Sequence, residues 1–203
     1  MNKPRLMIYV QNLLGIGHLR RAAGISRAAV ERGFDVRFVS GGFPIKDLNI
    51  GGAEFYQIPP VRSLDGDFKT LVAENDKEID DLWRKKRRKL LLDLFEKIQP
   101  KILLTELFPF GRRQFRFELI PLLTKAKEAK CCSQVVCSMR DILVTKPRYD
   151  RNLEIVETLE NFYQKILVHG DRKVISLAET FPLENRISPV SYTHLTLPTT
   201  PYV

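Results

Sequence analysis

The sequence has no hydrophobic run that approaches the ~20 residues needed to cross a bilayer. Its apolar start, MNKPRLMIYV, has strand length and lacks the small-residue cleavage site of a signal peptide. Cysteine is scarce, since Cys131, Cys132 and Cys137 are the only three, and they form neither a CxxC pair nor a metal-ligand spacing with histidine. We therefore expect a cytoplasmic chain with reduced thiols and no metal site.

Acidic residues are too few to balance the basic ones. The chain has 33 Lys and Arg against 24 Asp and Glu, which gives a formal net charge of +9. This excess favours an anionic partner, and nucleic acid, anionic lipid and a phosphorylated small molecule all fit it. At 203 residues, of which 44% are hydrophobic, the chain is long enough to bury the core of one domain.

The C-terminal segment 189–203 contains no Asp, Glu, Lys or Arg, although the chain before it is densely charged. Its Thr- and Pro-rich pattern favours neither a helix nor strand pairing, and the string SYTHLTLP resembles a translated sequencing adapter. We expect a non-native tail that carries no chemistry at His194, with a genuine Thr/Pro-rich linker as the alternative. The folded part is then a single domain, residues 1–188, truncated before a second domain.

Residues 1–188 alternate between apolar segments of strand length and amphipathic segments with helical spacing. This alternation predicts a doubly wound α/β domain, in which helices cover both faces of a parallel, Rossmann-like sheet. Gly33 is placed to end the first helix, and Pro121 is expected near the first turn of the third. The predicted strands are 5–11, 35–42, 54–60, 101–108, 134–140 and 165–171, and the predicted helices are 19–32, 76–98, one within 110–130, and 150–164.

Ligands of such sheets bind where the carboxyl ends of the strands and the helix N-termini converge. Glycines, arginines, carboxylates and a histidine follow the predicted strands at these positions. The candidate substrate-binding residues are Gly15, Gly17, Arg20, Gly41, Gly42, Glu106, Arg112, Arg113, Arg140, Asp141 and His169.

The first loop, LLGIGHLRR, has the outline of an anion site. Gly15 and Gly17 let backbone N–H groups approach a ligand, and the helix that follows adds a partial positive charge. A dinucleotide fingerprint is absent, because Arg20 replaces its third glycine and Ser40 and Gly41 replace its acid, and no P-loop is present. We therefore expect no cofactor. His18 is either a general base or a helix-capping side chain.

Other basic segments allow two interpretations each. The run 84–89, formed by Arg84, Lys85, Lys86, Arg87, Arg88 and Lys89 after Trp83, is either a solvated helix face or a contact with the inner membrane surface. Nucleic acid is disfavoured, because no zinc-finger, RNP or GXXG pattern accompanies it. Arg112 and Arg113 either hold an anion or form a rim, Arg140 and Asp141 either bind substrate or pair, and His169 either binds substrate or begins a turn.

Several segments resemble the N-terminal half of predicted GT-B glycosyltransferases, a group similar to family 28 enzymes such as the GlcNAc transferase that makes lipid II. They are YVQNLLGIGHLRRAAGISRAAVERGFDVRFVSGG, IPPVRSLDGDFKTLV, LLTELFPFGRRQFRFELIPLL, VVCSMRDILVTKP and KILVHGD. The resemblance implies two Rossmann-like domains that face a cleft, an acceptor-side domain followed by one that binds the nucleotide-sugar donor, and no metal. Only the first would be present here.

By the same resemblance, the Gly15–His18 turn lies beside the donor diphosphate and the acceptor, and His18 is the catalytic base. The lipid II enzymes carry GGTGGH where this chain has LLGIGH, which leaves the acceptor open. The expected function is transfer of a sugar from a nucleotide sugar to an acceptor hydroxyl, with this fragment inactive alone. The alternatives are a GT-B nucleotide-sugar epimerase and a basic module that binds anionic membrane or nucleic acid.

Overall fold

A parallel seven-stranded sheet forms the centre of the computed structural model, which describes residues 3–64, 70–140, 149–170 and 177–187 and the backbone of 191–195. The strand order is β3-β2-β1-β6-β7-β8-β9, and every pairing within this sheet is parallel. The strands are β1 (Arg5–Val10), β2 (Asp35–Ser40), β3 (Glu54–Gln57), β6 (Ile102–Glu106), β7 (Gln134–Arg140), β8 (Lys165–His169) and β9 (Ser191–Leu195).

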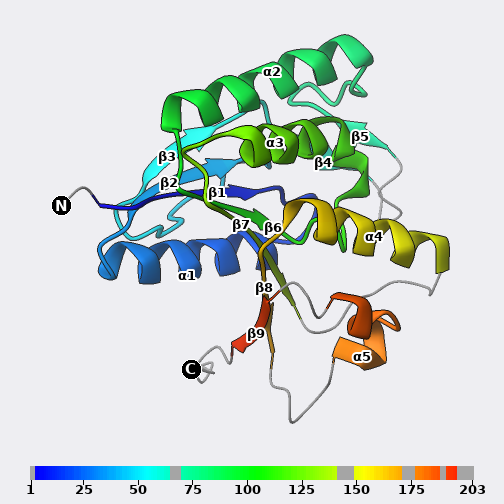
Figure 1. Ribbon diagram of the computed structural model, residues 1–203. Coiled ribbons are helices and arrows are strands. Elements are labelled where there is room, and N and C mark those ends of the chain that lie inside the picture. Colours follow the sequence, from blue (N-terminus) through cyan, green and yellow to red (C-terminus); the bar gives the residue numbers. More distant parts are fainter. Residues whose placement is uncertain (1–2, 65–69, 141–148, 171–176, 188–190, 196–203) are drawn as a thin grey trace, which may run out of the picture.

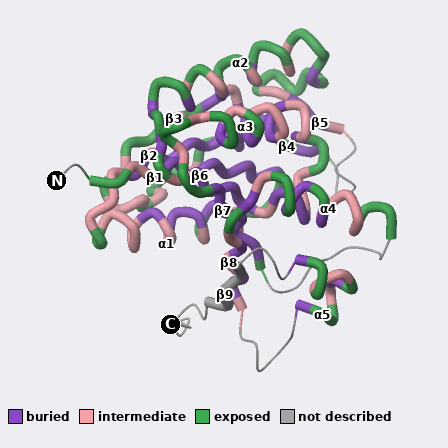
Figure 2. Tube along the Cα trace, in the orientation of Figure 1, coloured by how far each residue is buried: buried purple, intermediate pink, exposed green. Residues whose placement is uncertain are grey.

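Helices cover both faces of this sheet (Figure 1). On one face lies α1 (Gly17–Glu31), and on the other lie α2 (Asp81–Ile98), α3 (Arg116–Glu128) and α4 (Tyr149–Phe162). Successive residues of a strand point to opposite faces, so the strands contribute to two hydrophobic clusters, and Figure 2 shows these central strands as largely buried. The predicted doubly wound Rossmann-like fold is confirmed.

Short elements complete the chain. An antiparallel pair, β4 (Arg62–Ser63) and β5 (Leu71–Val72), lies apart from the main sheet. The 3₁₀ helix η1 (Arg113–Phe115) precedes α3, and α5 (Leu177–Thr180) and η2 (Glu184–Ile187) follow β8. None of these was predicted, because two to four residues are too few to show a hydrophobic period. No helix in the described part of the chain is long and apolar enough to cross a membrane.

Two predicted helix details are wrong. The helix α2 begins at Asp81 and not near residue 76, because the Asp80 side chain accepts a hydrogen bond from the Trp83 N–H (2.6 Å) and caps it there. Pro121 lies in the second turn of α3, since this helix already begins at Arg116. Gly33 ends α1 with φ of 85°, as predicted from its position.

The prediction that residues 189–203 form no strand is also wrong. Residues 191–195 form β9, which pairs in parallel with β8. The edge of β8 would otherwise present unpaired backbone groups, and a segment with Tyr and Thr has good strand propensity. The prediction rested on the Thr- and Pro-rich pattern, but the prolines lie outside residues 191–195. The non-native origin of the tail stays a prediction.

The topology fixes where a ligand site belongs. The chain leaves β1 toward β2 on one side, and β6 continues toward β7 on the other, so the winding direction reverses between β1 and β6. The loops at the carboxyl ends of two such strands separate and leave a crevice between them. The loop after β1 holds Gly15 to His18, and β6 ends at Glu106.

Candidate functional site

A pocket of about 320 Å³ lies at this switch point. It is formed by the loop after β1, the start of α1, the loop after β6 and the last residue of β7. The strands thus bring together five of the residues predicted to bind substrate or catalyse the reaction, from segments far apart in the sequence. The lining residues are Leu14, Gly15, Gly17, His18, Arg21, Arg112 and Arg140.

The N-terminus of α1 opens into this pocket with its backbone amides available. Among the described residues, no side chain caps the helix at Ile16, and no acidic residue lies in its first turn. Apart from its immediate neighbours along the chain, a Cβ atom built on Gly15 or Gly17 would meet no described atom within 4 Å, so no other described segment packs over these two positions. Uncapped N–H groups and the helix dipole together favour an anion.

His18 lies in the first turn of α1, and its side chain is 23% exposed. Its Nδ1 atom is 3.0 Å from Glu106 Oε1 and 3.0 Å from Arg21 Nη2. Arg21 also donates a hydrogen bond to Glu106 Oε1. These three side chains therefore form one cluster at the floor of the pocket.

Glu106 was predicted to bind substrate; its side chain is fully buried and is absent from the pocket lining, and direct contact with substrate stays a prediction. Burial raises the pKa of this carboxyl, but the hydrogen bond from His18, the charge of Arg21 and the hydroxyl of Ser138 (2.7 Å) lower the pKa below its ordinary value. Glu106 is therefore ionised and is a hydrogen-bond acceptor for His18. This contact is a hydrogen bond in the tautomer that carries the ring proton on Nδ1, whereas a hydrogen bond from Arg21 Nη2 would need Nδ1 without a proton.

Three guanidinium groups surround the pocket. Arg21 comes from α1, Arg112 from the loop after β6, and Arg140 from the exposed end of β7. Arg112 adopts a left-handed backbone with φ of 60°, and its Nε donates to the Gln11 carbonyl (2.5 Å), which fixes the side chain beside the loop after β1. Glu106 offsets the charge of Arg21, so Arg112, Arg140 and the helix N-terminus make the pocket positive.

Two predicted arginines lie elsewhere. Arg20 is exposed and outside the pocket lining, whereas Arg21, which was not predicted to bind, lies within it. The helical spacing gave a usable signal, because Arg21 is three residues after His18 and so shares its face. Arg113 of η1 pairs with Glu154 of α4 at 3.1 Å, and Arg116 of α3 pairs with the same carboxylate, so Arg113 links η1 to α4. Asp141 lies outside the described residues.

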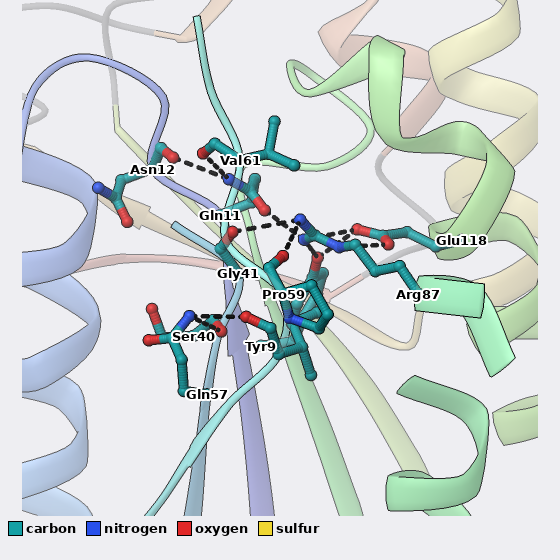
Figure 3. A network of polar contacts seen from close by, with 11 residues as sticks. Tyr9, Gln11, Asn12, Ser40, Gly41, Gln57, Pro59, Val61, Arg87 and Glu118 are labelled. Atoms are coloured by element: carbon teal, nitrogen blue, oxygen red, sulfur yellow. Dashed lines mark hydrogen bonds and ion pairs between the residues drawn. The ribbon is translucent and has the colours of Figure 1, made fainter. Parts of the chain in front are cut away.

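Gly41 and Gly42 were predicted to bind substrate, but both are buried. A Cβ at Gly41 would clash with Arg87 and Gln11, and a Cβ at Gly42 would clash with Asn12. Figure 3 shows Gly41 within the polar network around Arg87. Close packing of buried side chains therefore favours glycine at both positions, and contact of Gly41 and Gly42 with substrate stays a prediction.

The basic run 84–89 does not form one exposed surface. Arg87 is 1% exposed and points inward, where it pairs with Glu118 of α3 (Figure 3). The prediction that this residue contacts a membrane is wrong, because the helical period turns one residue of the run toward the core. Contact of the other five basic residues with an anionic membrane stays a prediction.

His169 ends β8 and was predicted to bind substrate, but it is only 6% exposed and does not line the pocket. Its Nε2 lies 3.1 Å from Ser138 Oγ. Burial and the nearby charge of Arg21 lower the pKa of His169 from 6.5 to about 4, although Glu106 acts in the opposite direction. The ring is therefore neutral at pH 7.

The lowered pKa of His169 predicts a pH-dependent stability. In the unfolded chain this ring binds a proton below about pH 6.5, whereas in the folded chain the lowered pKa keeps the ring neutral down to about pH 4. Relative to His169→Gln, the wild type should lose about 3 kcal/mol of unfolding free energy between pH 7 and pH 4. Urea denaturation of both proteins across this range measures the difference, and parallel curves would contradict it.

Comparison with known proteins identifies structures of similar fold. No protein-family model and no curated protein matches this chain. A glycosyltransferase from Rickettsia africae ESF-5 superposes with a TM-score of 0.58 at 15% identity, over 97% of this chain and 43% of its own. Phytolacca americana UGT2, complexed with UDP-2fluoro-glucose and pterostilbene, gives 0.58 at 14% identity, over 98% and 56%. The calicheamicin glycosyltransferase CalG4 gives 0.51 at 13% identity, over 97% and 53%.

This chain has the fold of one half of a GT-B glycosyltransferase. It spans about half the length of the structures that it matches, and at such low identity the likeness shows the fold alone. The expectation of a GT-B architecture is confirmed at this level. The narrower resemblance to family 28 and its lipid II enzyme stays a prediction.

Proposed function

We propose that this chain is the acceptor-side half of a glycosyltransferase that moves a sugar from a nucleotide-sugar donor to an acceptor hydroxyl. The observation that carries the proposal is His18, which lies in a positive pocket with Nδ1 3.0 Å from the buried carboxylate of Glu106. The GT-B fold supports it, as does the UDP-sugar bound to one of the similar structures. The donor would bind mainly to a second half that follows this one.

The geometry suits a single displacement at the anomeric carbon. Nε2 of His18 accepts the proton of the acceptor hydroxyl. The hydroxyl oxygen then forms the new bond to the anomeric carbon of the sugar, while the bond from this carbon to the nucleoside diphosphate breaks. Glu106 accepts a hydrogen bond from the Nδ1–H group of His18, and its negative charge stabilises the imidazolium that results. The uncapped start of α1 and the guanidinium groups of Arg112 and Arg140 stabilise the negative charge that develops on the diphosphate.

The epimerase alternative is less well supported. That reaction would use a carboxylate as an acid or base in the pocket, but the described lining residues include no Asp or Glu. Glu106 is fully buried behind His18 and held ionised by Arg21. Its lowered pKa makes it a poor proton donor at neutral pH.

The positive pocket can be tested with this chain and inorganic diphosphate as the probe. Arg140→Gln should weaken diphosphate binding roughly 10-fold, because one charge-assisted contact is lost. Arg20→Gln is the matched control, since Arg20 is exposed outside the pocket, and it should bind as the wild type does. Isothermal titration calorimetry at fixed ionic strength measures both. Equal weakening by the two variants would mean that only the overall charge attracts the anion.

A further inference from the structure

A continuous chain of polar contacts runs from the pocket into the sheet. It begins at His18, passes through the carboxylate of Glu106 and the hydroxyl of Ser138, and ends at His169. Glu106 ends β6, Ser138 lies in β7 and His169 ends β8, so the contacts cross three adjacent strands. The sequence did not predict that Ser138 and His169 contact each other, or that either contacts Glu106, because 31 residues separate Ser138 from His169.

The pleat of the sheet places these side chains on the same face. Cys137, Met139 and Val168 pack in the cluster that includes α2, α3 and α4. Their neighbours Ser138 and His169 therefore point to the opposite face, where α1 lies and from which His18 and Arg21 approach Glu106. Ser138 is the register partner of Glu106, which explains their contact of 2.7 Å.

From His169 to Glu106, each group in this series of hydrogen bonds donates to the next. The ionised Glu106 only accepts, so Ser138 donates its single hydroxyl proton to Oε2. Ser138 Oγ is then an acceptor for His169, and the neutral ring of His169 carries its proton on Nε2. His169 Nδ1 is left as a buried acceptor without a hydrogen-bond partner in the described part of the chain.

From these contacts we propose that Ser138 and His169 are positioning residues for His18. They hold Oε2 of Glu106 so that Oε1 faces His18 Nδ1, which keeps the ring protonated at Nδ1 and Nε2 free as a base. This inference deepens the glycosyltransferase proposal and rests on it for the role of the base. The hydrogen-bond chain itself exists independently of any reaction.

Arg21 makes the positioning necessary. Its Nη2 lies as close to His18 Nδ1 as Glu106 Oε1 does, at 3.0 Å, and it is a donor. If the carboxylate rotates away, Arg21 can donate to Nδ1, and the proton then moves to Nε2, where it blocks the base. The hydroxyl of Ser138 prevents this rotation because it fixes the second carboxylate oxygen.

The tautomer of His18 can be measured in this chain by ¹⁵N NMR of the histidine rings at pH 7.5. In the wild type, Nδ1 should resonate as a protonated nitrogen and Nε2 as an unprotonated one. Ser138→Ala and His169→Leu should both move the Nε2 resonance toward the protonated position. His169→Gln should preserve the wild-type pattern, because its amide N–H can replace the Nε2 donor to Ser138.

Thr105→Val is the matched control. Thr105 is a buried neighbour of Glu106 on the opposite face of β6, and its hydroxyl lies 2.8 Å from the Tyr163 hydroxyl. This variant also loses a buried hydrogen bond, and its melting temperature should fall, but its His18 tautomer should not change. Melting temperatures of all variants separate unfolding from loss of positioning, and Ser138→Ala, the smallest change, decides the case if His169→Leu does not fold.

The outcomes separate the two proposals. If the wild-type ring is protonated at Nδ1 and Ser138→Ala does not change this, the positioning role is overturned and His18 stays as the base. A wild-type ring protonated at Nε2 overturns the assignment of the base itself, and the positioning role with it. A tautomer shift in Thr105→Val as large as in Ser138→Ala would also overturn the positioning role, because any loss of packing would then produce it.

Discussion

Replacement of Arg87 by methionine should lower the free energy of unfolding by about 3–5 kcal/mol, because it leaves the buried Glu118 carboxylate without its cation. The Arg87 side chain is 1% exposed and that of Glu118 is fully buried. Their contact is 2.9 Å from Nε to Oε2 and 3.1 Å from Nη2 to Oε1, a bidentate geometry that methionine cannot replace.

Arg87 also links α2 to the sheet. It donates to the Tyr9 hydroxyl (3.0 Å), the Pro59 carbonyl (2.8 Å) and the Gly41 carbonyl (3.3 Å), which Figure 3 shows converging on one guanidinium. Burial lowers the pKa of Arg87, but Glu118 and Tyr9 raise it above its ordinary value, so the cation persists. The methionine variant thus loses several charge-assisted contacts at once.

Urea denaturation at pH 7 measures this loss. Lys86→Met is the matched control, because Lys86 lies one residue earlier in α2 and is exposed, and its effect should stay within about 0.5 kcal/mol. The double variant Arg87→Met with Glu118→Gln should be more stable than Arg87→Met alone, since no unpaired charge remains. A loss below about 1 kcal/mol in Arg87→Met would show that water reaches the pair.

The sequence predicted the sheet well because buried parallel strands have a strong signal. All six predicted strands of residues 1–188 exist, and their apolar runs reflect burial on both faces. The loop with Gly15, Gly17 and His18 lies at the end of β1 as expected, while its role in binding or catalysis stays a prediction. The first strand of such a sheet is followed by a turn and a helix N-terminus, so the position of an anion site follows from the topology.

The rest of the site depends on contacts that a single sequence does not show. Glu106 and His169 end their strands and Gly41 follows one, as ligand residues do, but all three are buried among residues from other elements. The inward direction of Arg87 depends on where α2 rests on the sheet, and its partner Glu118 is 31 residues away. A buried ion pair has no sequence signature beyond two charged residues.

Replacement of His18 by alanine should lower kcat by about 10²–10⁴-fold in the protein that joins this half to its donor-binding half, if His18 is the base. The donor KM should change little, because the guanidinium groups of Arg112 and Arg140 and the start of α1 remain. The acceptor hydroxyl then has to lose its proton to water. Release of nucleoside diphosphate from a panel of nucleotide sugars, measured with and without acceptor, gives both constants.

The neighbouring charges supply the controls for His18→Ala. Arg20→Gln should keep the wild-type kcat, since this exposed side chain lies outside the pocket although it is only two residues away. Glu106→Gln keeps the shape of the buried group but removes its charge, so the ring loses its preference for a proton on Nδ1 and kcat should fall as well. A His18→Ala protein with the wild-type kcat would remove His18 as the base, whatever the behaviour of Glu106→Gln.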